Sequence, residues 1–207
     1  MIRGTLATLR DVVPLRPLTQ SEAYRIAELQ AGRLLKLAGV TEPPVPNSAI
    51  LDVPKIQVRY MKPWPVSGCT DWTGSMWTIA INASEPPVRQ RFSLAHEFKH
   101  ILDHRFIHLL YPDSPTMTSQ ARSELVCDYF AGCLLIPKIW LRKAWTEGVQ
   151  TSPALARRFG VSTAAIEVRL SQTGLALPQD RCDRAPSQIA APQRYYRSAS
   201  SADPVAA

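Results

Sequence analysis

The order of apolar and polar residues along the chain predicts short strands and several amphipathic helices. Residues 56–60 alternate between apolar and polar types, and residues 77–82 (WTIAIN) are rich in β-formers, so both segments are expected to be strands. Helical spacing is expected over 19–38, 88–104, 119–136 and 138–147, and in two short helices around Gly160 between 151 and 175. The pattern therefore predicts an α+β fold with a small β-sheet.

Start and stop signals divide the chain into segments. Thr19 and Glu22 have the spacing of a capping box, Pro137 follows the helix expected at 119–136, and Ser162 and Gly174 frame the last helix. We expect a loose lead-in over 1–18, a core domain over 19–150, and a helical segment like a helix-turn-helix over 151–177. Residues 63–75 are expected to be a loop, and the Pro-, Ala- and Ser-rich residues 178–207 a disordered tail.

Composition and charge exclude several classes of protein. With 45% hydrophobic and 20% charged residues, the 207-residue chain has a globular composition. It contains no apolar run of the roughly 18 residues that a membrane span needs, and no secretory signal is evident. The four cysteines lack C-x-x-C spacing, which is typical of reduced thiols in a cytoplasmic protein. The net charge of +7 is spread along the chain, which favours a solvated surface over a nucleic-acid footprint.

Two of the four histidines form an H-E-x-x-H sequence, from His96 through Glu97 to His100. Residues four apart on a helix differ by about 40° and one turn, so both imidazoles can reach one metal ion. Glu97 lies about 100° from His96, where its carboxylate can activate a water molecule. Four apolar residues on the other side of the helix would pack against the core: Leu94, Phe98, Ile101 and Leu102. The pattern predicts a zinc site for hydrolysis rather than a surface helix with stray histidines.

A catalytic zinc usually has three protein ligands, so a third ligand is needed. His104 has rotated by about 80° and climbed two turns from His96, and we expect it to be a helix-end surface group or to support the site from outside the metal. Glu124 and Asp128 lie one turn apart on the next helix. The first could bind zinc while the second accepts the distal N–H of a ligand histidine. By spacing alone, a solvated acidic face explains this pair equally well.

Three stretches of the sequence resemble the ImmA/IrrE-type zinc metallopeptidases. These are residues 81–82 with 89–100, residues 124–137 (ELVCDYFAGCLLIP), and residues 155–170, which begin LARRFGVS. The second stretch is similar to the family pattern E-x-x-A-N-x-F-A-x-x-L-L-M-P. The resemblance implies a zincin-like, gluzincin-type core with one Zn²⁺ per chain, His96, His100 and Glu124 as ligands, and Glu97 as general base.

The chain departs from the family pattern near the expected site. Phe98-Lys99 stands where Leu-Gly is more usual, and Cys127 replaces the usual alanine. We expect Lys99 to lie near the rim of the cleft, where it would alter substrate choice, and Cys127 to be a small buried group. Neither departure removes an expected ligand.

The resemblance implies regulated proteolysis of a separate protein substrate. Members of the family often cut a helix-turn-helix transcriptional repressor of a mobile element, a prophage or a stress response. The alternative is a DNA-binding or antitoxin-like regulator with a vestigial metal site, because residues 151–175 look like a helix-turn-helix. Three arginines there could contact phosphate: Arg157, Arg158 and Arg169. Because Thr163, Ala164 and Glu167 are poor base readers, we expect the pair to pack on the core instead.

Overall fold

The computed structural model describes residues 4–175, and the tail expected from 178 onward lies outside these residues. The strands are β1 (Ile56–Met61), β2 (Gly68–Trp72) and β3 (Trp77–Asn82). The helices are α1 (Thr5–Arg10), α2 (Gln20–Leu37), α3 (Ser48–Leu51), α4 (Pro87–Asp103), α5 (Ile107–Leu110), α6 (Ser119–Leu135), α7 (Lys138–Thr146), α8 (Ser152–Phe159) and α9 (Thr163–Thr173). The expected α+β fold with a small sheet is confirmed.

The three strands form one sheet in the order β1-β3-β2. β1 runs parallel to β3, and β2 runs antiparallel to it, with Gly68 opposite Ile81 and Thr70 opposite Ile79. Ile79 and Ile81 are fully buried on the face of the sheet that α4 covers. The prediction of a loop over 63–75 was therefore wrong at β2. Its residues have a weak strand pattern, and pairing with β3 fixes their extended conformation.

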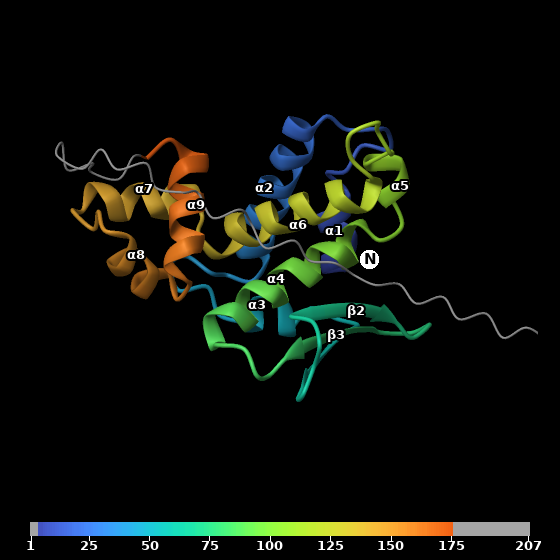
Figure 1. Ribbon diagram of the computed structural model, residues 1–207, viewed down its shortest axis with the longest axis horizontal. Coiled ribbons are helices and arrows are strands. Elements are labelled where there is room, and N and C mark those ends of the chain that lie inside the picture. Colours follow the sequence, from blue (N-terminus) through green and yellow to red (C-terminus); the bar gives the residue numbers. More distant parts are fainter. Residues whose placement is uncertain (1–3, 176–207) are drawn as a thin grey trace, which may run out of the picture.

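Helix α4 lies between the sheet and α6, and α2 crosses α6 on the side away from the sheet (Figure 1). The predicted apolar stripe of α4 is buried, with Phe98 and Ile101 fully enclosed. The predicted capping box at the start of α2 is also present, because the Thr19 side chain accepts from the Glu22 amide and the Glu22 carboxylate accepts from the Thr19 amide. The buried apolar stripe packs α4 against its neighbours, including α6.

Within the expected lead-in, the described residues 4–18 are not loose, so that prediction was wrong for them. Helix α1 buries Leu9, and the Arg10 guanidinium donates to the carbonyl oxygens of Ile101 and Leu102 at 2.6 and 3.1 Å. These are unpaired carbonyls near the end of α4, which a cation stabilises. A helix of one and a half turns with a single buried leucine has too few positions to show periodicity, which explains why the sequence pattern missed it.

Helices α8 and α9 meet at Gly160, whose φ of +64° ends α8, and the Ser162 side chain caps α9 as predicted. Arg169 is 1% exposed, and its Nε donates to the Ile136 carbonyl oxygen at the end of α6. The expectation that Arg169 could contact phosphate was therefore wrong. Arg158 lies 2.7 Å from Glu147 in an ion pair. The helical pair thus packs on α6. Separately, no helix among residues 4–175 is long and apolar enough to cross a bilayer.

Candidate metal centre

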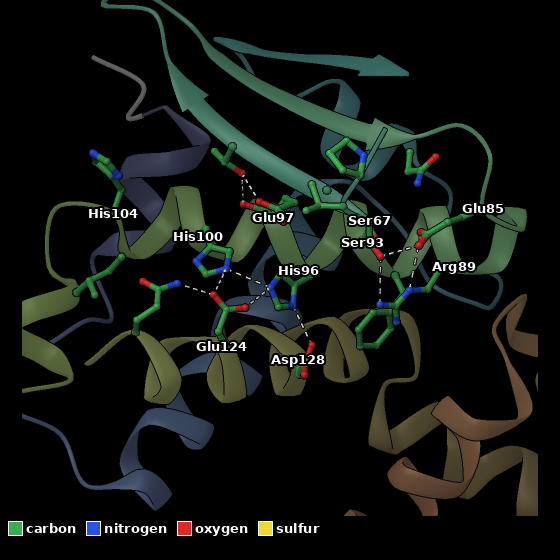
Figure 2. A pocket seen from close by; sticks show the side chains of 18 residues that line it. Ser67, Glu85, Arg89, Ser93, His96, Glu97, His100, His104, Glu124 and Asp128 are labelled. Carbon is green, nitrogen blue, oxygen red and sulfur yellow. Dashed lines mark hydrogen bonds and ion pairs between the residues drawn. The ribbon is translucent and has the colours of Figure 1, made fainter. Parts of the chain in front are cut away.

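Side chains from α4 and α6 converge on one point at the floor of a cavity of about 420 Å³ (Figure 2). His96 Nε2 lies 3.1 Å from His100 Nε2. Glu124 Oε2 lies 3.1 Å from His96 Nε2, and Glu124 Oε1 lies 3.4 Å from His100 Nε2. Around a tetrahedral zinc ion with ligand bonds of about 2.0–2.1 Å, neighbouring donor atoms are about 3.3 Å apart. The three donors therefore have the spacing of such a site.

Asp128 determines which nitrogen of His96 faces this point. Its Oδ1 lies 2.8 Å from His96 Nδ1, and a carboxylate can only accept, so Nδ1 carries the proton and Nε2 is the atom available to a metal. The structure thus places Asp128 where the sequence analysis expected it, one turn beyond Glu124 and behind a histidine. This contact fixes both the ring orientation and the tautomer of His96.

The electrostatics of the cluster suit a cation. Burial disfavours a charged His96, but the hydrogen bonds with Asp128 and Glu124 outweigh it and raise the pKa of His96 to about 9. Burial also opposes ionisation of Glu124, yet its hydrogen bonds with His100 and His96 hold its pKa well below the usual range. Two carboxylates thus stabilise a positive charge between them. The raised pKa favours a protonated His96 at neutral pH, and a divalent cation bound by His96 Nε2, His100 Nε2 and Glu124 would supply the positive charge instead.

Cys127 provides a second possible donor set with the same histidines. Ligand atoms of His96, His100 and Cys127 all lie within 4.8 Å of one another. Cys127 is fully buried, as predicted, and burial followed by the charge of Asp103 raises its thiol pKa. Glu124 lies 3.1 and 3.4 Å from the two histidine nitrogens and lines the cavity, whereas Cys127 is not among its lining residues. The geometry therefore favours Glu124, although both sets satisfy the spacing of a metal cluster.

Glu97 approaches the site from the other side. Figure 2 shows it on the sheet side of the histidines, whereas Glu124 lies on the α6 side. Glu97 as a residue is 8% exposed, and its Oε2 accepts a hydrogen bond of 2.7 Å from Thr70 Oγ1 on β2. The sequence analysis missed Thr70, because β2 was expected to be a loop and carried no signal of its own.

His104 lies at the end of α4, outside the group of converging donors. Its exposed ring packs edge-on against Trp77, with 4.8 Å between the ring centroids, and it lines one end of the cavity. This position agrees with a helix-end surface group and places the ring on an aromatic neighbour instead of on a ligand histidine.

Lys99 does not lie at the rim of the cleft, and that prediction was wrong. Its side chain is fully buried, and Nζ donates to Asp103 Oδ1 at 2.7 Å and to Gln30 Oε1 at 2.8 Å. The Tyr111 hydroxyl donates to the other oxygen of Asp103 at 2.6 Å. The Lys99 side chain instead reaches α2, where Gln30 is its partner.

Comparison with known proteins places the sequence in a family. The model for the IrrE N-terminal-like domain, a family of peptidases, matches residues 52–171, which include every converging residue described above. The chain belongs to this family. The resemblance to ImmA/IrrE-type proteins is thereby confirmed, and the family points to a peptidase. No curated protein matches the sequence.

A solved structure with a similar fold is that of a Mycobacterium tuberculosis transcriptional regulator. The two structures superimpose with a TM-score of 0.59 at 18% sequence identity, over 86% of this chain and 54% of the regulator. At this identity the similarity shows the fold alone. This chain spans about half the length of that regulator.

Proposed function

We propose that the protein is a zinc-dependent endopeptidase, with His96, His100 and Glu124 as zinc ligands and Glu97 as the general base. The observation that carries this proposal is the convergence of donor atoms from three residues, with contacts of 3.1–3.4 Å, beside a carboxylate that reaches the same cavity. When bound, zinc supplies Lewis-acid chemistry that activates water and stabilises the negative charge on the attacked carbonyl oxygen.

The chain's own residues would provide binding and proton transfer. Glu97 takes a proton from the attacking water and returns it to the leaving amine. Asp128 keeps His96 in the tautomer that a metal ligand needs. β2 forms one edge of the described sheet and lines the cavity at Gly68 and Thr70, so an extended peptide could bind along this edge.

We further propose that the substrate is a helix-turn-helix transcriptional repressor, cleaved in the cytoplasm. This rests on the resemblance to ImmA/IrrE-type proteins. The rival function, direct DNA binding with a vestigial metal site, loses support because Arg169 is buried and Arg158 is paired with Glu147. The intact donor geometry also argues against a vestigial site.

Metal content decides between the two donor sets. Purified wild type, Glu124→Ala and Cys127→Ala would be analysed side by side by mass spectrometry. We expect about one zinc per chain in the wild type and in Cys127→Ala, and loss of zinc in Glu124→Ala. Zinc lost only in Cys127→Ala would assign the thiol as the third ligand. A folded wild type without metal would refute the proposal and make salt-dependent DNA binding the next test.

Activity is tested with purified helix-turn-helix repressors and with a peptide library made from a bacterial proteome. New N-termini, identified by mass spectrometry, would report cleavage. Glu97→Gln serves as the matched control, because it preserves the shape of the side chain and leaves the proposed ligands intact. We expect this variant to keep zinc and to lose cleavage. Turnover by Glu97→Gln would show that another group is the base.

A further inference from the structure

We propose that Gly68 and Thr70 of strand β2 position the carboxylate of Glu97, with Thr70 as a hydrogen-bond donor and Gly68 as the space that the side chain occupies. The inference deepens the proposed peptidase function and rests on it, because Glu97 has a catalytic role only there. Neither residue is part of the H-E-x-x-H motif.

Gly68 and Thr70 point to the same face of the sheet, because side chains two apart on a strand share a face. Their partners on β3, Ile81 and Ile79, are fully buried against α4, so this is the face that covers the metal helix. The edge strand thus contacts Glu97 directly from the side opposite α6.

The Thr70 hydroxyl donates its single proton to Glu97. Its Oγ1 lies 2.7 Å from Glu97 Oε2, the shorter contact, and 3.3 Å from the Glu97 backbone carbonyl oxygen, so the carboxylate is the main acceptor. A hydrogen bond from a hydroxyl to a carboxylate is stronger than one between neutral groups. It restrains the Glu97 side chain, which could otherwise rotate within the cavity.

Gly68 provides the space for this arrangement. A Cβ atom at position 68 would lie 2.9 Å from Glu97 Cγ and 3.1 Å from Glu97 Oε1, whereas contacts under 3.0 Å are essentially never seen for real Cβ atoms. The backbone of Gly68 does not require glycine, since its φ is not positive. The glycine is therefore needed for the close approach of Glu97.

The test compares Thr70→Val, which keeps the shape but removes the hydroxyl, with Thr70→Ser, which keeps the hydroxyl. Thr78→Val is the matched control, because Thr78 is one residue from the buried Ile79 on β3 and points to the other face of the sheet. Gly68→Ala tests the space requirement. Each variant would be loaded with cobalt, and its affinity for acetohydroxamic acid measured by visible absorption. This chelator gives up its hydroxyl proton to a nearby base, so its binding reports where Glu97 lies.

We expect all four variants to hold as much metal as the wild type. Thr70→Val should bind acetohydroxamic acid about 10-fold more weakly, as loss of a hydrogen bond to a charged group implies. Gly68→Ala should also bind it more weakly, because the added methyl group displaces Glu97. Thr70→Ser and Thr78→Val should match the wild type. Equal affinity of Thr70→Val and wild type would overturn the inference. An equal loss in Thr78→Val would also overturn it, because the effect would then be a general one on the sheet.

Crystal structures of Thr70→Val and Thr70→Ser without added metal provide a readout that does not depend on the proposed function. We expect the Glu97 carboxylate to move by about 1 Å or more in Thr70→Val, a displacement large enough to impair catalysis, and to stay in place in Thr70→Ser. An unmoved carboxylate in Thr70→Val would refute the positioning role even if the protein is a peptidase. A moved carboxylate in a protein that binds no metal would support the contact while refuting the peptidase proposal.

Discussion

Replacing Lys99 by methionine tests the buried polar network beside the proposed metal site. Lys99 and Asp103 are both fully buried and lie 2.7 Å apart. Methionine has a similar length but no charge, so the substitution leaves the Asp103 carboxylate buried with only the Tyr111 hydroxyl as a partner among the contacts described. Gln30 Oε1 would lose the Lys99 ammonium as its donor as well.

The expected loss is large. Removing one partner of a buried ion pair costs about 3–5 kcal/mol, because the other charge stays desolvated without compensation. For a protein of this size, each kcal/mol lowers the melting temperature by about 2–4 °C. Lys99→Met should therefore lower it by about 6–20 °C. Thermal and urea unfolding followed by circular dichroism would measure the change.

Two further variants make the experiment decisive. Lys143→Met is the matched control, because Lys143 also pairs with an acid four residues later but is exposed, and we expect its stability to equal that of the wild type. The double variant Lys99→Met/Asp103→Leu removes both charges, so its loss should be smaller than the sum of the two single losses. A decrease of less than about 1 kcal/mol in Lys99→Met, or strictly additive losses in the double variant, would refute this account of the network.

Three other outcomes follow from the site and the helical pair. Asp128→Ala should weaken zinc binding by about 10–100-fold in chelator competition, because His96 loses the partner that orients it, and unchanged affinity would contradict that role. In the metal-free protein the pKa of His96 is raised from 6.5 to about 9, so its contribution to stability is complete below pH 6.5 and is lost as the pH rises through 9. The lowered pKa of Glu124 has the opposite sign, with stability present above pH 4.5 and lost on acidification. The melting temperature of the metal-free wild type should therefore fall as the pH rises from 6.5 to 9, and it should fall less steeply in Asp128→Asn. A melting temperature that does not change over this pH range would contradict the contribution of His96. Arg169→Met should cost about 1–3 kcal/mol in urea unfolding by leaving the Ile136 carbonyl oxygen without its donor, whereas the exposed Arg157→Met should have little effect.

Features that depend on local spacing could be predicted from the sequence. The two histidines of α4 face one point because they are one turn apart, and the same holds for Glu124 and Asp128 on α6. The capping box of α2 and the turn at Gly160 are equally local. Each of these features depends on residues within a few positions of one another, so the local sequence is enough to predict it.

Features that depend on distant partners could not be predicted. Lys99 contacts Gln30 from 69 residues away, Arg10 contacts Leu102 from 92 residues away, and Thr70 contacts Glu97 from 27 residues away. From the sequence alone, each of these residues could equally lie on the surface or in a loop. Only the packing of α1, α2 and β2 around α4 gives these side chains their partners.

The contacts around α4 explain how this amphipathic helix can hold the proposed ligands in one orientation. Lys99 directly precedes His100, and its ammonium is bonded to α2 and, one turn on, to Asp103. Arg10 binds carbonyl oxygens at the end of the same helix, while Thr70 holds Glu97 from the sheet. A rotation of α4 about its axis would break the Lys99 and Thr70 contacts together, because they lie on different sides of the helix. We therefore expect Lys99→Met to weaken metal binding in the folded protein as well as stability, although Lys99 contributes no atom to the site.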